Sequence, residues 1–494
     1  MTAITPTTTV VPEPTTDVEL EKLLEAAQTA AAPLAALRPA ERAALLDAVA
    51  VALERAADHL IPTAEKETRL PEARLRAELK RTTFQLRLFG EVLRDGGYLD
   101  ARIDHADVNW PMGAPRPDIR RVLVPVGPVV VFAASNFPFA FSVAGGDTAS
   151  ALAAGSPVLL KAHSGHPALS RLTAEVVVAA LRDAGAPAGT FALITGTASG
   201  AAALRDPRVK AGAFTGSIPG GRALFDIASS RPEPIPFFGE LGSNNPAFVT
   251  DAAAAERGAE IAAGFVHSFT LGAGQFCTKP GMLFVPAGSD MVDVLRSAAL
   301  PSAAPLLNDR IQSGYTEVLR SLQSNPRLEV LAQGTGPLAN PPAPTLLLTT
   351  AEDMLADPHA LQTECFGPTA VVVTYDDETA LPGLAETFAG QLTATIHGTN
   401  SCHVAPLVTV LARKAGRVVW NQWPTGVSVT YAQQHGGPYP ATTAAGSTSV
   451  GTAAIERFLR PVAYQGFPQH LLPEAIREEN PLQLPRLIDG RLQA

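Results

Sequence analysis

Cysteine is scarce in this chain of 494 residues, which has only Cys277, Cys365 and Cys402 and no CxxC pair. We therefore expect neither a disulfide framework nor a zinc site, and the cysteine usage fits a reducing cytoplasm. Long hydrophobic runs are also missing. No segment approaches about 18 apolar residues free of Gly, Pro or charge, which excludes a membrane-spanning helix. The first residues, MTAITPTTTVVPEPTTD, lack a basic and an apolar region, so we expect no secretory signal.

Positive charge is in the minority, with 38 Lys and Arg against 47 Asp and Glu and a net charge of −9. This balance argues against nucleic acid as the main partner, because phosphate binding needs a basic surface. Residues 69–87 are locally basic but include Glu72 and Glu78, so we interpret them as a solvated helix face. The length exceeds that of a single hydrophobic core and predicts two or three domains.

Apolar periodicity predicts helices first and then a parallel sheet. Leu45, Val49 and Leu53 repeat at helical spacing, and so do Leu86, Phe89 and Leu93. From Val122 the chain alternates between β-branched runs and small-residue or amphipathic helices. Expected elements are strands near 122–134, 158–161 and 191–195, a helix over 169–183, and further strands at 282–285, 369–374 and 417–420. Strands that are apolar along their whole length need helices packed on both faces of their sheet, which predicts a doubly wound α/β fold.

Cys277 lies in the stretch GQFCTKPG, a turn bracketed by glycines where backbone amides can converge on a nucleophile. A free cysteine is more often a small core residue. As a nucleophile its thiol would need amide dipoles or a nearby base, since a thiol of ordinary pKa near ~8.5 is mostly protonated at neutral pH. Both interpretations stay open on this stretch alone.

Two other polar residues could serve the same chemistry. Glu240, in FFGELGSNNP, lies between apolar residues and a glycine-rich turn, where desolvation would raise its pKa toward that of a general base. A salt-bridged structural acid is an equal alternative. Asn136, in SNFPF, follows a buried strand, and its side-chain amide could donate to an oxyanion. An ordinary turn residue is the alternative there.

A nucleotide site is indicated by Lys161, which ends a strand of the sheet and can donate to ribose hydroxyls. The stretch FTGSIPGG adds Gly216 and Gly221 at a strand-to-helix turn whose amides can face a phosphate. This spacing is not GxGxxG, so it is a weak dinucleotide fingerprint by itself.

Taken in order, these stretches resemble the aldehyde dehydrogenase superfamily: Asn-Phe-Pro, a strand ending in Lys, FTGS-x-x-x-G, E-L-G, G-Q-x-C and E-x-F-G-P. The last motif is here Glu364 to Pro368. Within the superfamily the chain is most similar to the α-ketoglutarate semialdehyde (2,5-dioxovalerate) dehydrogenases and related NADP-using bacterial enzymes. That likeness rests on FSVAGGDTASALAAGSPVLLKAHSGHP, HGGPYPATT and SVGTAAIERFLRPVAYQGFP.

The resemblance implies a mechanism. Cys277 attacks the aldehyde to form a thiohemiacetal, and the Asn136 amide and the Cys277 N–H hold the oxyanion, each donor contributing on the order of 3 kcal/mol. Hydride transfer to NADP or NAD leaves a thioester, and Glu240 activates the water that hydrolyses it. The residues implied for cofactor binding are Lys161, Ser164, Phe214, Thr215, Gly216, Ser217, Gly221, Glu364 and Phe366. No metal is implied.

The resemblance also implies the architecture: a Rossmann-type cofactor domain, an α/β catalytic domain and a small oligomerisation arm. We expect a mobile N-terminus over 1–16, a cofactor domain over 17–240 with part of the arm near 103–121, and a catalytic domain over 241–430. The chain would return to the cofactor domain over 431–464 and end in an oligomerisation tail over 465–494. The resemblance also implies a homodimer or homotetramer that acts on a small aldehyde. We expect neither nucleic acid nor a membrane as a partner.

The sequence departs from the common pattern at two positions. Ser164 stands where many NAD-preferring members have Glu, so a 2′-phosphate is not repelled and NADP becomes tolerable. However, residues 196–203, where an NADP user could supply an Arg, contain no basic residue, so NAD stays open. Lys279 follows Cys-Thr where Asn is common; it could lower the pKa of the thiol or meet an anionic substrate, but we expect it to point to solvent. Alternative functions are an acyl-CoA-forming relative, against which Glu240 argues, and a catalytically silent member of the fold.

Overall fold

The structure is a computed structural model that describes residues 13–338 and 340–493. These residues form two compact units, the first comprising 13–213, 227–236 and 452–493 and the second 214–226 and 237–451. The domain boundaries expected from the sequence stay a prediction. The N-terminal segment expected to be mobile is 1–16, and residues 1–12 of it lie outside the described residues. In the described part, the Thr15 N–H donates to the Thr195 carbonyl, and Thr16 caps the first helix.

The first unit begins with four helices and continues as alternating strands and helices, as the periodicity predicts. Its elements are α1 (Asp17–Ala36), α2 (Pro39–Arg55), α3 (Ala57–Thr68), α4 (Glu72–Asp95), η1 (Gly97–Leu99), β1 (Arg102–Asp104), β2 (Ile119–Pro125), β3 (Val129–Phe132), α5 (Gly146–Ala154), β4 (Val158–Lys161), α6 (Pro167–Asp183), β5 (Phe191–Ile194), α7 (Thr197–Arg205), β6 (Ala211–Thr215), η4 (Thr452–Phe458), β15 (Leu459–Gln465), η5 (Gln469–Leu471), η6 (Glu474–Ile476), β16 (Arg486–Ile488) and β17 (Arg491–Gln493).

The second unit contains its own sheet and the segment that carries Cys277. Its elements are α8 (Ile218–Ser229, which runs into the first unit), β7 (Phe237–Glu240), β8 (Ala247–Val249), α9 (Asp251–Thr270), η2 (Leu271–Gly274), β9 (Met282–Pro286), α10 (Met291–Arg296), α11 (Asp309–Ser324), β10 (Glu329–Gln333), β11 (Thr345–Thr350), α12 (Ala351–Ala356), α13 (Pro358–Leu361), β12 (Thr369–Tyr375), η3 (Glu378–Ala380), α14 (Leu381–Glu386), β13 (Gln391–His397), α15 (Ala405–Lys414) and β14 (Ala415–Trp420).

The described strands form three sheets, ordered β5-β4-β3-β6-β7, β10-β11-β12-β9-β8-β13-β14 and β15-β2-β1-β16-β17. Strand β4 pairs in parallel with β3 and β5, and β9 pairs in parallel with β8 and β12. Consecutive side chains of β3 and of β9 are all buried, so both faces of these strands are covered. This confirms the α/β class expected from the continuous apolar strands.

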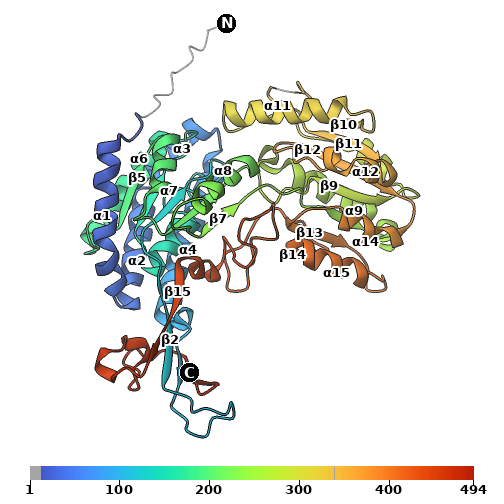
Figure 1. The fold of residues 1–494 in the computed structure, drawn as a ribbon. Helices are drawn as coiled ribbons and strands as arrows, with labels where there is room; N and C mark the ends of the chain where they lie inside the picture. Colours follow the sequence, from blue (N-terminus) through green and yellow to red (C-terminus); the bar gives the residue numbers. More distant parts are fainter. Residues whose placement is uncertain (1–12, 339, 494) are drawn as a thin grey trace. The chain divides into compact units, whose positions relative to one another are not determined.

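The run that begins at Val122 divides between two sheets, a detail that the pattern of β-branched residues did not predict. Strand β2 pairs antiparallel with β15 in the sheet β15-β2-β1-β16-β17, which together with its connecting loops is here called the arm, whereas β3, after Gly127 and Pro128, joins the parallel sheet. Gly127 has a φ of +114°, a backbone conformation that favours glycine, and this turns the chain from one sheet to the other. Figure 1 shows β2 and β15 side by side along the arm.

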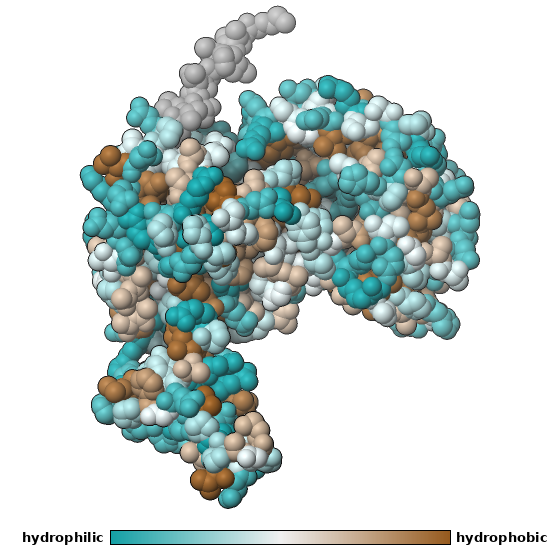
Figure 2. All heavy atoms as spheres, in the orientation of Figure 1, coloured by the Kyte–Doolittle hydropathy of each residue, from teal (hydrophilic) through white to brown (hydrophobic). Residues whose placement is uncertain are grey.

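The arm exposes several large apolar side chains, and Figure 2 shows brown, hydrophobic patches on its surface. Exposed members are Val108, Trp110, Met112, Phe467, Leu471 and Leu492. Among the described helices, none is both long and apolar enough to cross a membrane.

Candidate active site

Residues 271–281, here called the cysteine loop, follow α9 and begin with η2, whose backbone is unusual. Gly272, Ala273 and Gly274 all have positive φ values, of +57°, +55° and +68°. A Cβ atom on Gly274 would lie 2.1 Å from the carbonyl oxygen of Gly367, so no other residue fits there. Cys277 comes three residues later and is half-buried. The glycines flanking Cys277 therefore serve the close backbone approach that forms this loop.

Asn245 fixes the cysteine loop from the side of β8. Its side-chain Nδ2 donates to the carbonyl oxygens of Cys277 at 2.8 Å and of Lys279 at 2.9 Å. Its Oδ1 accepts from the backbone and side chain of Thr393 and from Ser243. Asn245 is fully buried, so these bonds are shielded from water and hold the loop in one conformation.

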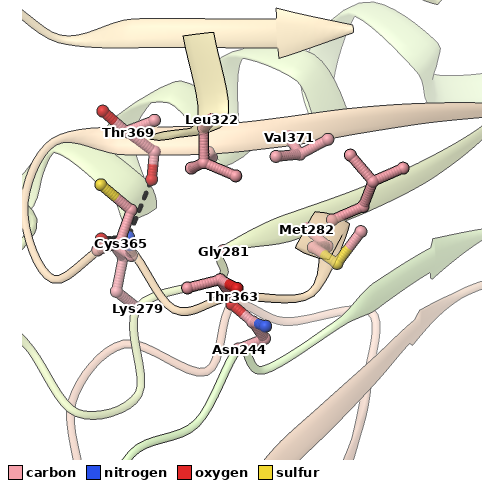
Figure 3. A pocket seen from close by; sticks show the side chains of 11 residues that line it. Asn244, Lys279, Gly281, Met282, Leu322, Thr363, Cys365, Thr369 and Val371 are labelled. Carbon is pink, nitrogen blue, oxygen red and sulfur yellow. Dashed lines mark hydrogen bonds between the residues drawn. The ribbon is translucent and has the colours of Figure 1, made fainter. Parts of the chain in front are cut away.

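Lys279 is buried, so the expectation that it points to solvent is wrong. Its ammonium donates to the carbonyl oxygens of Cys365 at 2.6 Å, Gly367 at 3.1 Å and Thr369 at 2.8 Å. Figure 3 shows it among the residues lining a small pocket beside Cys365 and Thr369. Burial lowers the pKa of Lys279, and the three carbonyls satisfy its three N–H donors. Its role is to hold together the turn after Glu364.

Glu240 ends β7 and is only 2% exposed. Its Oε1 lies 2.9 Å from Nε2 of His435, and its Oε2 accepts the hydroxyl hydrogen of Ser449 at 2.5 Å. Burial by itself raises the pKa of Glu240, but the charge and hydrogen bond of His435 and the hydrogen bonds of Ser449 and Cys277 lower it below the ordinary value. The expected upward shift is therefore wrong. Glu240 is an ionised carboxylate at neutral pH and ready to accept a proton.

The Cys277 sulfur belongs to the same cluster as Glu240 and His435. Its Sγ lies 3.5 Å from Nε2 of His435. Burial raises the pKa of the Cys277 thiol well above its ordinary value, and the negative charges of Glu240 and Glu364 add to this rise. The thiol therefore holds its proton in this arrangement, and the nearby base that the sequence required is present.

The same three residues are close enough to share a metal ion, with ligand atoms within 4.8 Å of one another. However, the distance of 2.9 Å between Nε2 of His435 and Oε1 of Glu240 is that of a direct hydrogen bond. Two ligands of a tetrahedral zinc ion would lie about 3.3 Å apart, given metal–ligand distances of about 2.0–2.1 Å. We therefore interpret the cluster as a hydrogen-bonded network.

His435 and Ser449 are the site residues that sequence reasoning missed. Both lie in stretches that carry the family resemblance, HGGPYPATT and SVGTAAIERF, but no local pattern assigned them a role. They are separated from Glu240 by 195 and 209 residues in the chain. The one available signal was a histidine in a glycine-rich loop, which also suits a surface turn.

The turn before α8 has features that suit a phosphate. A Cβ atom on Gly221 would lie 2.0 Å from Cδ2 of Leu241, so any larger residue requires the Leu241 side chain to shift. Gly216 and Ser217 are exposed at the helix N-terminus, where backbone N–H groups and the helix dipole favour an anion. The hydroxyl of Thr215 is buried without a hydrogen-bond partner among the described residues. The half-buried Phe214 packs against the glycines of this turn.

Glu364 and Phe366 flank Cys365 in the second unit and are both half-buried. Burial raises the pKa of Glu364 to about 7, although Lys279 and the N–H of Ser243 oppose the rise. A Cβ atom on Gly242 would lie 2.3 Å from Oε2 of Glu364, so the glycine of the E-L-G motif makes room for this carboxylate.

In the first unit, helix α4 holds the Asn-Phe-Pro loop. Oε1 of Glu78 accepts the N–H groups of Phe139 at 2.8 Å and Ala140 at 2.9 Å, and Arg74 donates to the Asn136 carbonyl at 2.9 Å. Burial raises the pKa of Glu78 to about 7. The interpretation of residues 69–87 as a solvated face is thus wrong for this acid, whereas Arg76 does lie exposed in ion pairs.

The other predicted residues of the first unit are Lys161 and Ser164. Lys161 ends β4, and a Cβ atom on Gly200 would lie 2.8 Å from its Cγ, so glycine there makes room for the lysine chain. Ser164 is exposed in the loop before α6. The structure thus brings Cys277 and Glu240 together within the second unit. The roles of Asn136, Lys161 and Ser164, which belong to the first unit, stay predictions.

A buried carboxylate beside a cysteine on a glycine-bracketed loop, with a separate α/β unit carrying Lys161 and Asn136, is the combination that the sequence motifs led us to expect. A model described as the aldehyde dehydrogenase family matches residues 5–306. The chain belongs to the aldehyde dehydrogenase family. It is accordingly an oxidoreductase that oxidises aldehydes with NAD or NADP.

Two curated relatives are 45% identical to this chain. The alpha-ketoglutaric semialdehyde dehydrogenase of Acinetobacter baylyi aligns over 462 residues, 92% of this chain and 87% of the relative. Alpha-ketoglutaric semialdehyde dehydrogenase 2 of Azospirillum brasilense aligns over 485 residues, 96% of this chain and 92% of the relative. Among solved structures, the succinic semialdehyde dehydrogenase of Streptococcus pyogenes, in complex with NADP+, has a TM-score of 0.76 at 19% identity, covering 92% and 96% of the two chains. That likeness supports the shared fold.

Proposed function

We propose that this enzyme oxidises α-ketoglutaric semialdehyde or a closely similar small semialdehyde to the carboxylic acid, with Cys277 as nucleophile and Glu240 as general base. The observation that carries the residue assignment is the convergence of the Cys277 sulfur and a Glu240 carboxylate oxygen, which lie within 4.8 Å of each other in one cluster of the second unit. The substrate follows from the names of the two relatives at 45% identity.

The proposed chemistry uses the geometry of the cysteine cluster. Cys277 Sγ attacks the aldehyde carbon and forms a thiohemiacetal, whose oxyanion accepts a hydrogen bond from the Cys277 N–H. The family resemblance implies the Asn136 amide as a second donor. A bound NAD or NADP would supply the hydride acceptor, and loss of the hydride from the thiohemiacetal would leave a thioester on Cys277. Glu240 then takes a proton from water, and the resulting hydroxide hydrolyses the thioester. An ionised Glu240 fits this last step, because only the carboxylate can accept the proton.

The cofactor residues remain those that the resemblance implies. We propose that the α8 turn, Phe214 to Gly221, binds a phosphate group, and the buried, unpaired Thr215 hydroxyl supports a ligand there. Lys161 and Glu364 would bind ribose hydroxyls, and Phe366 would pack near the nicotinamide. Ser164 leaves room for a 2′-phosphate, which favours NADP.

We also propose that the enzyme acts in the cytoplasm as a homodimer or homotetramer. The exposed apolar side chains of the arm, among them Phe467, Leu471 and Leu492, support an interface between copies of the chain, because such side chains gain stability when they leave water. The three unpaired cysteines support a reducing compartment.

The test is an assay of NADPH and NADH formation against α-ketoglutaric semialdehyde, succinic semialdehyde and an uncharged aliphatic aldehyde. We expect the highest kcat/KM for the first aldehyde, no dependence on added coenzyme A, and complete loss of turnover in Cys277→Ala with cofactor binding retained. Cys402→Ala is the matched control, because Cys402 is a second half-buried free cysteine of the same unit. Substantial activity in Cys277→Ala would refute the nucleophile, and product release only with coenzyme A would refute hydrolysis.

A further inference from the structure

We propose that His435 is a catalytic residue that stabilises the thiolate of Cys277 by donating its Nε2 hydrogen to the sulfur as the thiol proton passes to Glu240. The inference deepens the proposed function and rests on it. It assigns a role to the residue that links the nucleophile and the general base.

The ring of His435 is held in place from several sides. Its side chain is fully buried, and its backbone N–H donates to the Thr448 hydroxyl at 2.8 Å. One ring nitrogen, Nε2, lies 2.9 Å from Oε1 of Glu240 and 3.5 Å from Sγ of Cys277. A single donor thus faces both the base and the nucleophile, and neither contact requires the ring to move.

The surroundings of the ring determine which nitrogen carries the proton. Nδ1 is buried and has no hydrogen-bond partner among the described residues. A hydrogen on Nδ1 would be left unsatisfied, and a bare Nε2 would face a carboxylate oxygen. A ring that carries its hydrogen on Nε2 avoids both costs. His435 is therefore a donor to Glu240 in the resting site and cannot accept the thiol proton on Nε2.

The proton transfer then balances without a further reactant. The S–H bond of Cys277 breaks, an O–H bond forms on the carboxylate of Glu240, and one negative charge moves from oxygen to sulfur. The hydrogen on Nε2 of His435 stays on the ring, and its hydrogen bond moves from Oε1 to Sγ. Glu240 must release the proton to solvent before it can accept another from the hydrolytic water.

The surrounding charges explain why the sulfur needs such a donor. Burial and the charges of Glu240 and Glu364 raise the pKa of the Cys277 thiol, so a thiolate formed here is poorly stabilised by solvent. Arg417 is a further charged group that interacts with the sulfur, and its buried Nε has no hydrogen-bond partner among the described residues. Its guanidinium donates to backbone carbonyls of Pro424 and Gly426. No hydrogen bond joins Arg417 to the sulfur among the described contacts, whereas Nε2 of His435 lies within hydrogen-bond distance of it, at 3.5 Å.

The experiment measures the rate at which iodoacetamide alkylates Cys277 as a function of pH, followed by mass spectrometry of the Cys277 peptide in the full-length enzyme without aldehyde. The variants are H435L, which removes the donor, and H435Q, which keeps an N–H group. H397L is the matched control. His397 is a buried histidine of the same unit whose ring packs on Trp423, with centroids 4.5 Å apart, and whose ring nitrogens have no partner among the described residues.

A hydrogen bond to a charged group corresponds to a shift of about one to two pKa units. In H435L we therefore expect the alkylation profile to move up by that amount and alkylation near pH 8 to slow about ten-fold or more. H435Q should stay within about three-fold of the wild type, and H397L should match it. Equal rates in H435L and the wild type, or equal losses in H435L and H435Q, would overturn the proposal.

A replacement variant and the choice of readout keep the result interpretable. If H435L does not fold, as judged by circular dichroism, H435M takes its place, since a flexible thioether fills an irregular cavity without an N–H donor. The alkylation readout uses no aldehyde, so it tests His435 independently of the substrate. Failure of the proposed function would instead be seen as persistent turnover in Cys277→Ala.

Discussion

Substitution of Ser449 by alanine tests how the second unit keeps Glu240 ionised. The Ser449 hydroxyl donates to Oε2 of Glu240 at 2.5 Å inside a cluster with almost no solvent exposure. A hydrogen bond to a buried charge contributes about 1.5–3 kcal/mol, which corresponds to about one to two pKa units. Because the bond stabilises the carboxylate, its loss raises the pKa of Glu240.

The sign of the pH effect follows from the direction of that shift. In the wild type the pKa of Glu240 lies below 4.5, so the base is ionised from mildly acidic pH upward. In Ser449→Ala the acid limb of thioester hydrolysis should move to higher pH by about one to two units. Steady turnover should be nearly unchanged near pH 8 and should fall increasingly below that of the wild type as the pH drops through the shifted acid limb.

Stopped-flow recording of NADPH separates the first turnover from hydrolysis, so the shift should be seen in the steady rate after the burst. Ser447→Ala is the matched control, because its hydroxyl donates to the Ala444 carbonyl at 2.9 Å in the same loop. Coincident acid limbs in Ser449→Ala, Ser447→Ala and the wild type would refute the reasoning.

Three further substitutions test other parts of the structure. Lys279→Met leaves three carbonyls without their buried donor and should lower the free energy of unfolding by about 3 kcal/mol in chemical denaturation. A loss below about 0.5 kcal/mol would contradict the role of Lys279 in holding the turn after Glu364. Gly221→Ala places a Cβ atom 2.0 Å from Leu241 and should lower the free energy of unfolding by about 1–3 kcal/mol and weaken NADP binding in a fluorescence titration. The control Gly220→Ala, whose Cβ atom would lie 3.2 Å from its nearest neighbour, should lower the free energy of unfolding by less. Equal effects of the two substitutions would contradict the steric argument. Glu78 has a pKa of about 7 in the fold against 4.5 ordinarily, so the wild type loses stability as pH rises through this window. The stability advantage of Glu78→Gln over the wild type, measured by thermal unfolding, should therefore grow to about 3 kcal/mol above this window. A stability difference independent of pH would exclude this titration.

Local sequence patterns predicted the elements well where a strand or helix is defined by its own residues. The helix expected over 169–183 is α6 (Pro167–Asp183), and the strand expected over 282–285 is β9 (Met282–Pro286). The α/β class followed from the same patterns. The division between β2 and β3 could not be predicted, because both runs are β-branched and their partner strands lie far away in the chain.

The site was predictable only as far as single residues mark it. Cys277 and Glu240 stand in motifs, and the structure brings them together. The partners His435 and Ser449 reach Glu240 across about 200 residues, and no local periodicity reports such a contact. The burial of Lys279 was also invisible in the sequence, because three backbone carbonyls rather than a carboxylate receive its ammonium. The positive charge of Lys279, taken alone, suggested that its side chain points to solvent.

The pairing within the arm has a consequence for biosynthesis. Strand β1 (Arg102–Asp104) lies parallel to β16 (Arg486–Ile488), and β2 (Ile119–Pro125) pairs with β15 (Leu459–Gln465). A ribosome therefore exposes the first two strands long before it has made their neighbours. During that interval their open edges can pair with other nascent chains. Growth conditions that slow translation of the second half should thus increase aggregation before they affect the specific activity of the finished enzyme.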